Sequence, residues 1–250
     1  MSHAISRPEE ARIALARLFQ EHDRVVFFGG AGVSTASGIP DFRSQDGLYR
    51  QRFAYPPETI LSHSFYLSHR GEFYDFYRSK MIALDAKPNR CHLKLAELEG
   101  AGRISAVVTQ NIDGLHQMAG SRRVFELHGS VHRNICQRCG ALFDAAWIMA
   151  RESEDAQGVP VCPHCRGEIK PDVVLYEEPL DEGVMLGAIE AIARADALVI
   201  GGTSLVVYPA AGLTRYFQGD TLAIVNRDAT DQDARADLLI SCDIAEAFAF

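Results

Sequence analysis

Four apolar runs of strand length recur along the 250-residue chain, and each ends at a polar or glycine-rich cluster. Such runs, apolar without alternation, are typical of strands buried on both faces of a parallel sheet. Helical spacing lies between them, at residues 89–99, closed by Gly100, and at 182–194. The runs are Arg24–Phe28 before Gly29–Gly32, Ser105–Thr109 before Gln110–Asp113, Ala197–Ile200 before Gly201–Ser204, and Thr221–Val225 before Asn226.

This order predicts an α/β fold with a doubly wound, Rossmann-like parallel sheet. Ligands of such sheets bind beyond the carboxyl ends of the strands, so we expect the polar clusters to converge on one cleft. Two stretches interrupt the alternation, an aromatic-rich helical insertion at 44–87 and a cysteine-containing module at 132–170. We therefore predict a larger nucleotide-binding domain, residues 1–43, 88–131 and 171–250, and a smaller lobe built from the two interrupting stretches.

The N-terminal residues predict a folded helix and no export signal. Ser6 to Glu9 has the spacing of a capping box with Pro8 in the first turn, and the apolar spacing continues to about His22. No apolar stretch approaches the roughly 18 residues that suggest a membrane span. These features favour a cytoplasmic protein that does not enter a membrane.

The net charge of the chain indicates which kinds of macromolecule it can bind. The chain has 33 acidic residues against 25 lysines and arginines, a formal net charge of −8. Nucleic-acid binding needs a basic surface that displaces phosphate counterions. The charge therefore argues against nucleic acid as a partner and suits basic proteins that carry lysine.

Four of the six cysteines form two Cys-x-x-Cys pairs, a spacing typical of metal sites. The pairs are Cys136 with Cys139 and Cys162 with Cys165. Four thiolates satisfy the tetrahedral preference of Zn²⁺ and leave no open position, so we predict a structural zinc ion. Disulfides would need an oxidising compartment, and a catalytic dithiol would need only one pair. Cys91 and Cys242 are expected to be small buried side chains.

A glycine turn, Gly30-Ala31-Gly32, follows the first predicted strand. Such a turn lets backbone amides approach a pyrophosphate, and the N-terminus of a following helix adds its dipole. The dehydrogenase fingerprint needs a third glycine where this chain has Thr35, which argues against hydride transfer. Taken alone, the turn is equally compatible with a simple connection between strand and helix.

The residues around this turn closely resemble the signature of the sirtuin family, and further blocks follow in the family's order. The blocks are Gly30–Arg43, Gln110–Asp113 with Leu115 and His116, Glu126–Gly129, the cysteine pairs, Gly202–Leu205 and Ile224–Asn226. The resemblance extends from about Arg24 to Asp243. It implies an NAD-dependent protein-lysine deacetylase, in which the acyl oxygen of the modified lysine attacks the ribose carbon that bears nicotinamide. Nicotinamide leaves, and the acetyl group ends on ADP-ribose as O-acetyl-ADP-ribose.

The resemblance also implies a role for each residue of the predicted cleft. His128 would be the base that activates a ribose hydroxyl, a task suited to an imidazole that titrates near neutral pH. Asn111 and Asp113 would position the nicotinamide ribose and a water molecule, and with His128 they form the predicted catalytic set. The residues implied to bind NAD are Gly30, Ala31, Gly32, Ser34, Thr35, Asp41, Phe42, Arg43, Gln110, Asn111, Ile112, Asp113, Gly202, Thr203, Ser204, Asn226 and Asp243. Taken singly, many of the polar ones would be interpreted as helix caps.

The sequence lacks a residue pair that is typical of relatives that remove acidic acyl groups from lysine. Relatives that prefer acidic acyl groups resemble one another in a Tyr-x-x-Arg pair, whereas here Tyr74 is followed at the third position by Tyr77, and Tyr77 by Lys80. We therefore predict acetyl-lysine in proteins as the substrate. Removal of succinyl or malonyl groups stays an alternative, because the cations Arg78 and Lys80 lie in the same segment.

The segment Asp172–Tyr176 resembles the family's peptide-binding strand, and Glu177 stands where many members have glycine. Two rival functions share the same residues: a mono-ADP-ribosyltransferase, and a non-enzymatic NAD-sensing or zinc-ribbon module. The retention of His128 together with Asn111 and Asp113 favours deacylation.

Overall fold

The computed structural model describes residues 4–44 and 47–250; residues 1–3 of the predicted larger domain and 45–46 of the predicted helical insertion lie outside the described residues. Its main element is a six-stranded sheet in the order β3-β2-β1-β7-β8-β9, with neighbouring strands parallel. The strands are β1 (Val25–Gly29), β2 (Ile104–Thr109), β3 (Val124–Glu126), β7 (Ala197–Gly201), β8 (Thr221–Val225) and β9 (Leu238–Ile240). The predicted doubly wound α/β fold is confirmed.

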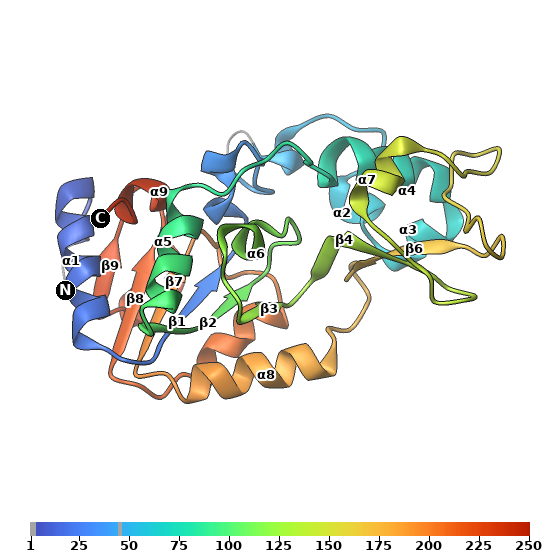
Figure 1. Cartoon of the computed structure of the whole chain (residues 1–250). Coiled ribbons are helices and arrows are strands. Elements are labelled where there is room, and N and C mark those ends of the chain that lie inside the picture. The colour runs from blue at the N-terminus through green and yellow to red at the C-terminus, as the bar shows by residue number, and fades with distance from the viewer. Residues whose placement is uncertain (1–3, 45–46) are drawn as a thin grey trace.

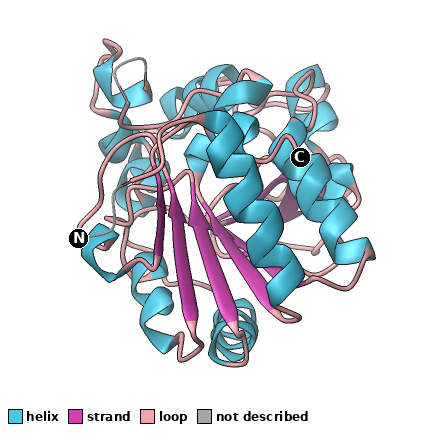
Figure 2. Cartoon of the chain, turned by 90° about the vertical axis from the view of Figure 1, so that its left-hand side faces the viewer, coloured by secondary structure: helices cyan, strands magenta, loops and turns pink. Residues whose placement is uncertain are grey.

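Helices cover both faces of this sheet (Figures 1 and 2). One face carries α1 (Pro8–Glu21), α5 (Arg90–Gly100) and α9 (Ile244–Ala247), and the other carries α8 (Glu182–Ala193) and a 3-10 segment, Ala210–Tyr216. Val25 and Phe27 belong to the first core, whereas Val26 and Phe28 belong to the second. Because both faces are covered, the central strands β1 and β7 are apolar throughout and do not alternate.

Two predicted helix ends need correction. Helix α1 begins after Arg7, and no side-chain cap bond forms at this residue in the part of the chain that the structure describes, so the capping box from Ser6 was wrong; Pro8 in the first turn was correct. Helix α5 includes Gly100, and it is Gly102 that adopts the left-handed φ of +75°. The glycine that ends the helix is therefore Gly102 and not Gly100, because a glycine ends a helix where its backbone adopts the left-handed conformation.

A second, three-stranded antiparallel sheet lies at the right of Figure 1, in the order β5-β4-β6. Helices from the segment 57–81 pack with it around a separate core of aromatic side chains that includes Tyr66, Phe73, Tyr74 and Tyr77. The elements of this part are α2 (Pro57–Ile60), α3 (His63–Ser68), α4 (Arg70–Phe76), a π-helical turn (Tyr77–Met81), β4 (Gly129–Cys136), β5 (Leu142–Phe143), α7 (Ala145–Ala150) and β6 (Ile169–Val173). Helix α6 (Leu115–Ala119) instead packs against α5 at the large sheet.

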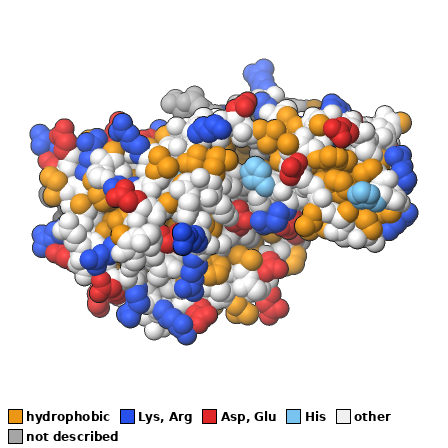
Figure 3. Space-filling view, viewed as in Figure 1, with side chains coloured by type: hydrophobic (Ala, Val, Ile, Leu, Met, Phe, Trp, Pro, Cys, Tyr) orange, Lys and Arg blue, Asp and Glu red, His pale blue; other side chains and the backbone are white. Residues whose placement is uncertain are grey.

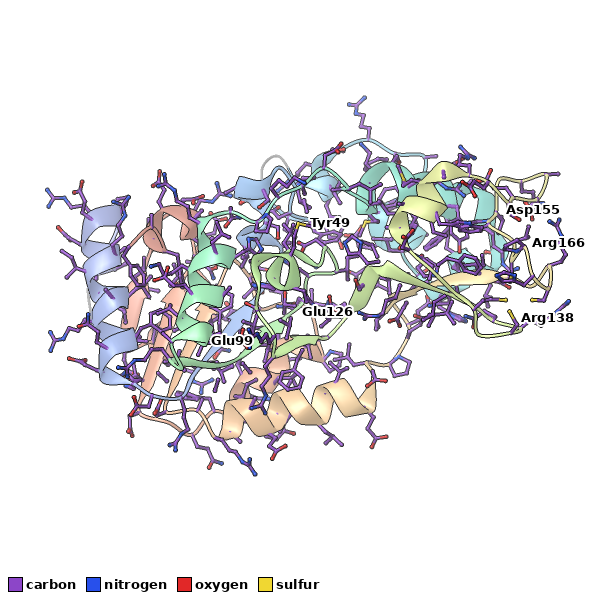
Figure 4. All side chains as sticks on the ribbon, viewed as in Figure 1. Tyr49, Glu99, Glu126, Arg138, Asp155 and Arg166 are labelled. Carbon is purple, nitrogen blue, oxygen red and sulfur yellow. The ribbon has the colours of Figure 1, made fainter. Side chains whose placement is uncertain are left out.

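An ion-pair bridge joins the two sheets. Arg133 on β4 donates to Glu126 on β3 at 2.7 Å and to Asp172 on β6 at 2.6 Å. Figure 4 shows Glu126 at this junction. On the face seen in Figure 3, basic and acidic side chains are interspersed over the larger part. Within the described residues, no helix is long and apolar enough to cross a membrane.

Candidate active site

The order of the strands reverses between β1 and β7, and a cleft of about 370 Å³ lies at the carboxyl ends of the strands at this point. The loops after β1, β2, β7 and β8 all contribute to its lining, so the four predicted segments meet, and the connection after β3 joins them. The predicted residues that line it are Gly30, Ala31, Gly32, Ser34, Asp41, Phe42, Arg43, Gln110, Asn111, Ile112, Asp113, His128, Gly202, Thr203, Ser204, Asn226 and Asp243. Thr35 is not among the described lining residues; its hydroxyl donates to the Gly32 carbonyl at 3.0 Å within the turn.

The glycine turn serves a close backbone approach. The N–H of Gly32 donates to the Gly202 carbonyl at 2.8 Å, and a β-carbon on Gly32 would lie 2.8 Å from the Gly202 Cα. The N–H of Gly30 is likewise bonded, to Gly201. Strand β1 is followed by two short 3-10 turns, Ala31–Val33 and Thr35–Ser37. The prediction that a helix N-terminus adds its dipole at this turn was therefore wrong. The N–H groups of Gly30 and Gly32 already donate to carbonyl oxygens of the protein.

His128 lies on the short connection between β3 and β4 and faces the cleft. Its Nδ1 lies 2.9 Å from the Gln110 carbonyl oxygen, and because a carbonyl only accepts, Nδ1 carries the proton and Nε2 keeps a lone pair. Burial lowers the pKa of His128, and the hydrogen bond to Gln110 opposes this in part. The ring is therefore a neutral, oriented base at pH 7.

Three polar side chains next to the base form one hydrogen-bonded chain. Asn111 Nδ2 donates to Ser34 Oγ at 3.0 Å, and Ser34 Oγ donates to Asp113 Oδ2 at 2.6 Å. The other oxygen of Asp113 accepts the N–H of Leu115 at 2.9 Å, a turn bond to the residue two positions on, whereas the N-cap position of α6 is Gly114. The aspartate therefore fixes the turn before α6 and also lines the cleft.

A second network joins the loops after β2, β7 and β8. Gln110 Nε2 donates to Thr203 Oγ1 at 3.0 Å. The Thr203 N–H donates to Asn226 Oδ1 at 3.0 Å, and Asn226 Nδ2 donates back to the Thr203 carbonyl at 2.7 Å. Asp243, on the same cleft, caps α9 by accepting the N–H of Ala245 at 2.8 Å. These bonds hold the loops in place without a ligand.

The loop that follows the glycine turn lies over the cleft. Asp41 accepts the N–H of Arg43 at 3.1 Å and so tightens the loop. The Phe42 ring packs edge-on against the Tyr49 ring, with 5.5 Å between ring centres, and the Arg43 guanidinium lies 5.1 Å from the centre of the Tyr49 ring. Tyr49 in turn is hydrogen-bonded through its hydroxyl to Tyr176 at 2.7 Å. This pair was missed from sequence because no local pattern connects residues so far apart in the chain.

Arg78 and Lys80, the two cations that could bind an acidic acyl group, lie in different surroundings. Arg78 is buried, pairs with Glu154, and donates to the carbonyls of Ile148 at 3.1 Å and Gly158 at 3.0 Å. It is not among the described residues that line the cleft. Lys80 does line it, and its ammonium donates to Gln51 at 3.3 Å.

The four paired cysteines lie together, with all four sulfurs within 4.8 Å of one another. The Cys136 and Cys165 sulfurs are 3.5 Å apart and those of Cys139 and Cys162 are 3.7 Å apart. These separations exceed a disulfide bond and match the about 3.8 Å between sulfurs around a tetrahedral zinc with about 2.3 Å bonds. None of the four is among the described residues that line the cleft, so this donor set suits a structural zinc ion.

Comparisons with known proteins agree with this geometry. The Sir2 family model matches residues 30–209. The chain is 54% identical to the NAD-dependent protein deacetylase of Clostridium acetobutylicum over 93% of this chain and 94% of that protein. It is 53% identical to the protein of the same name from Cutibacterium acnes, over 90% and 91%. A solved structure described as Sir2 with p53 peptide and NAD+ superposes with a TM-score of 0.82 at 40% identity, covering 94% of each chain. The chain therefore belongs to the Sir2 family, the sirtuins.

Proposed function

We propose that this chain is an NAD-dependent protein-lysine deacetylase, which transfers the acetyl group of a modified lysine to ADP-ribose and releases nicotinamide and O-acetyl-ADP-ribose. The observation that carries the proposal is the neutral imidazole of His128, oriented by the Gln110 carbonyl and placed in one cleft with Asn111 and Asp113. The names of the two bacterial relatives support the same activity, and neither favours a mono-ADP-ribosyltransferase or a desuccinylase.

The reaction assigns a task to each part of the cleft. The acyl oxygen attacks the ribose carbon as nicotinamide leaves, and Nε2 of His128 then takes the proton of a ribose hydroxyl that attacks the acyl carbon. Water then completes the reaction as the bond between the acyl carbon and the lysine nitrogen breaks, which releases free lysine and O-acetyl-ADP-ribose. Asn111 and Asp113 position the nicotinamide ribose and a water molecule. Phe42 shields the reacting carbon from solvent, which suppresses simple hydrolysis of NAD.

The remaining cleft residues bind the rest of NAD. Arg43 supplies a positive charge for the phosphates, Thr203, Ser204 and Asn226 hold phosphate and adenosine ribose, and Asp243 lies toward the adenine. Because the N–H groups of Gly30 and Gly32 are bonded within the protein, the phosphates depend on these side chains and on other backbone amides.

Zinc, when bound by Cys136, Cys139, Cys162 and Cys165, cross-links the two cysteine turns and supplies no open position for substrate. We also propose the division into a larger domain (1–43, 88–131 and 171–250) and a smaller lobe (44–87 and 132–170). A cytoplasmic location and the absence of nucleic-acid and membrane partners stay predictions from the charge and the N-terminal sequence.

Mass spectrometry tests the activity directly. The purified protein is incubated with NAD and matched acetyl-, succinyl- and unmodified lysine peptides, beside His128→Ala and the control His22→Ala, whose ring bonds the end of α1 away from the cleft. We expect loss of acetyl coupled to O-acetyl-ADP-ribose in the wild type and control, and a strong decrease of both with His128→Ala. Intact acyl peptides together with ADP-ribosylation of a protein acceptor would contradict the proposal.

A further inference from the structure

Glu177 has an unusual backbone for a residue with a side chain. It lies four residues after the end of β6 at Val173, is exposed, and lines the cleft. Its φ is +76°, in the left-handed region that costs free energy for every residue except glycine. A charged side chain is therefore present at a position whose backbone favours having none.

Hydrogen bonds to α3 hold this side chain in one direction. The Glu177 carboxylate accepts the Ser64 N–H at 2.9 Å and the Ser64 hydroxyl at 3.0 Å. The backbones also meet here, because Ser62 pairs with Tyr176 in a parallel bridge. Strained residues that the surrounding structure holds in place occur preferentially at binding and catalytic sites.

The charge of Glu177 is uncompensated, in contrast to that of its neighbour. Glu178 pairs with Lys170 at 3.2 Å and with His63 at 2.7 Å. Across residues 4–44 and 47–250, no cation forms an ion pair with Glu177. A residue that lines the cleft thus carries a carboxylate fixed by Ser64, next to the segment expected to bind the peptide.

Resting on the proposed deacetylase function, we infer that Glu177 is a specificity-determining residue that selects substrates with Lys or Arg close to the acetylated lysine. A basic side chain on the bound peptide supplies the missing counter-charge. Since the pair is exposed, the preference is modest, about two- to fivefold in kcat/KM. It also decreases with ionic strength, because salt screens exposed charges.

The test compares acetyl-lysine peptides that carry Arg, Gln or Glu at each position within three residues of the modified lysine. The readout is the ratio of kcat/KM for the Arg peptide to that for the Gln peptide, at low and high salt. Glu177→Gln removes the charge but keeps an acceptor for Ser64. Glu152→Gln is the matched control, because Glu152 is an exposed acidic residue outside the described cleft lining.

We expect wild type and Glu152→Gln to prefer the Arg peptide at one or more positions, and Glu177→Gln to bring that ratio close to one. A wild type without the preference, or a preference that survives Glu177→Gln or high salt, overturns the inference and leaves the deacetylase function standing. Failure of wild type to deacetylate any peptide, the Gln series included, overturns both.

Discussion

The hydroxyl oxygens of Tyr49 and Tyr176 lie 2.7 Å apart and join the loop that follows the glycine turn to the segment that follows β6. Figure 4 shows Tyr49 above the junction of the two sheets. Burial raises the pKa of Tyr49, so its hydroxyl stays protonated and can donate to Tyr176. The pair is thus a direct link between the predicted NAD loop and the predicted peptide strand.

Tyr49→Phe or Tyr176→Phe should weaken binding of both substrates. Loss of one hydrogen bond is worth about 0.5–1.5 kcal/mol, so we expect KM for NAD and for peptide to rise by roughly two- to tenfold. The double variant should be no worse than either single variant, because both remove the same bond. Tyr216→Phe, at an exposed ring, is the control. Additive effects in the double variant would mean that the two hydroxyls act separately.

The pH dependence of kcat/KM should show the depressed pKa of His128. Because burial lowers this pKa, the neutral base persists to lower pH, and the acidic limb of the profile should have its midpoint below the ordinary value of about 6.5. His128→Ala should lower the rate by about 10²- to 10⁴-fold and remove the limb. A midpoint above 6.5 in wild type would show that a different group, or a charged imidazole, controls the rate.

The cysteine cluster should bind one zinc ion per chain, measurable by elemental analysis. Removal of zinc with a chelator, or Cys162→Ser, should lower the melting temperature, because metal binding at such sites contributes directly to folding. Cys91→Ala should retain full zinc content, since this buried cysteine lies in the core beneath the large sheet. Full zinc content in Cys162→Ser would contradict a four-cysteine site.

Gly202→Ala and Gly100→Ala should have opposite effects on the free energy of unfolding. Gly202 has a φ of +59°, and a β-carbon there would lie 2.4 Å from the Val33 nitrogen, so the variant should lose at least about 1–3 kcal/mol and bind NAD poorly. A β-carbon at Gly100, within α5, would have no neighbouring atom within 4 Å, so alanine there should raise the free energy of unfolding by about 0.5–1 kcal/mol. Chemical denaturation and NAD titration measure both effects.

The Arg78–Glu154 pair should be structural and without influence on acyl choice. Glu154→Gln leaves the buried Arg78 guanidinium, whose pKa burial already lowers, without its counter-charge, and should cost about 3–5 kcal/mol of stability. Glu190→Gln breaks an exposed pair with Arg194 and should cost below about 1 kcal/mol. The ratio of acetyl to succinyl turnover should be equal in both variants; a selective change with Glu154→Gln would place Arg78 in the substrate site.

Local sequence was sufficient for the elements that depend on near neighbours. Mainly apolar runs predicted β1, β2, β7 and β8, because burial on both faces of a sheet favours apolar residues at consecutive positions of the strand. The cysteine spacing predicted the metal cluster, because two short turns suffice to bring two thiolates each to one ion. The convergence of the cleft residues followed from the shared direction of parallel strands.

Contacts between distant segments were decided by the tertiary structure. The Tyr49–Tyr176 bond, the burial of Arg78 and the engagement of the Gly32 amide by Gly202 each join residues that no local pattern relates. The left-handed backbone of Glu177 likewise follows from the turn that β6 makes toward α3. Periodicity and spacing report which residues are buried or close along the chain, whereas partners across the fold depend on how sheets and loops pack.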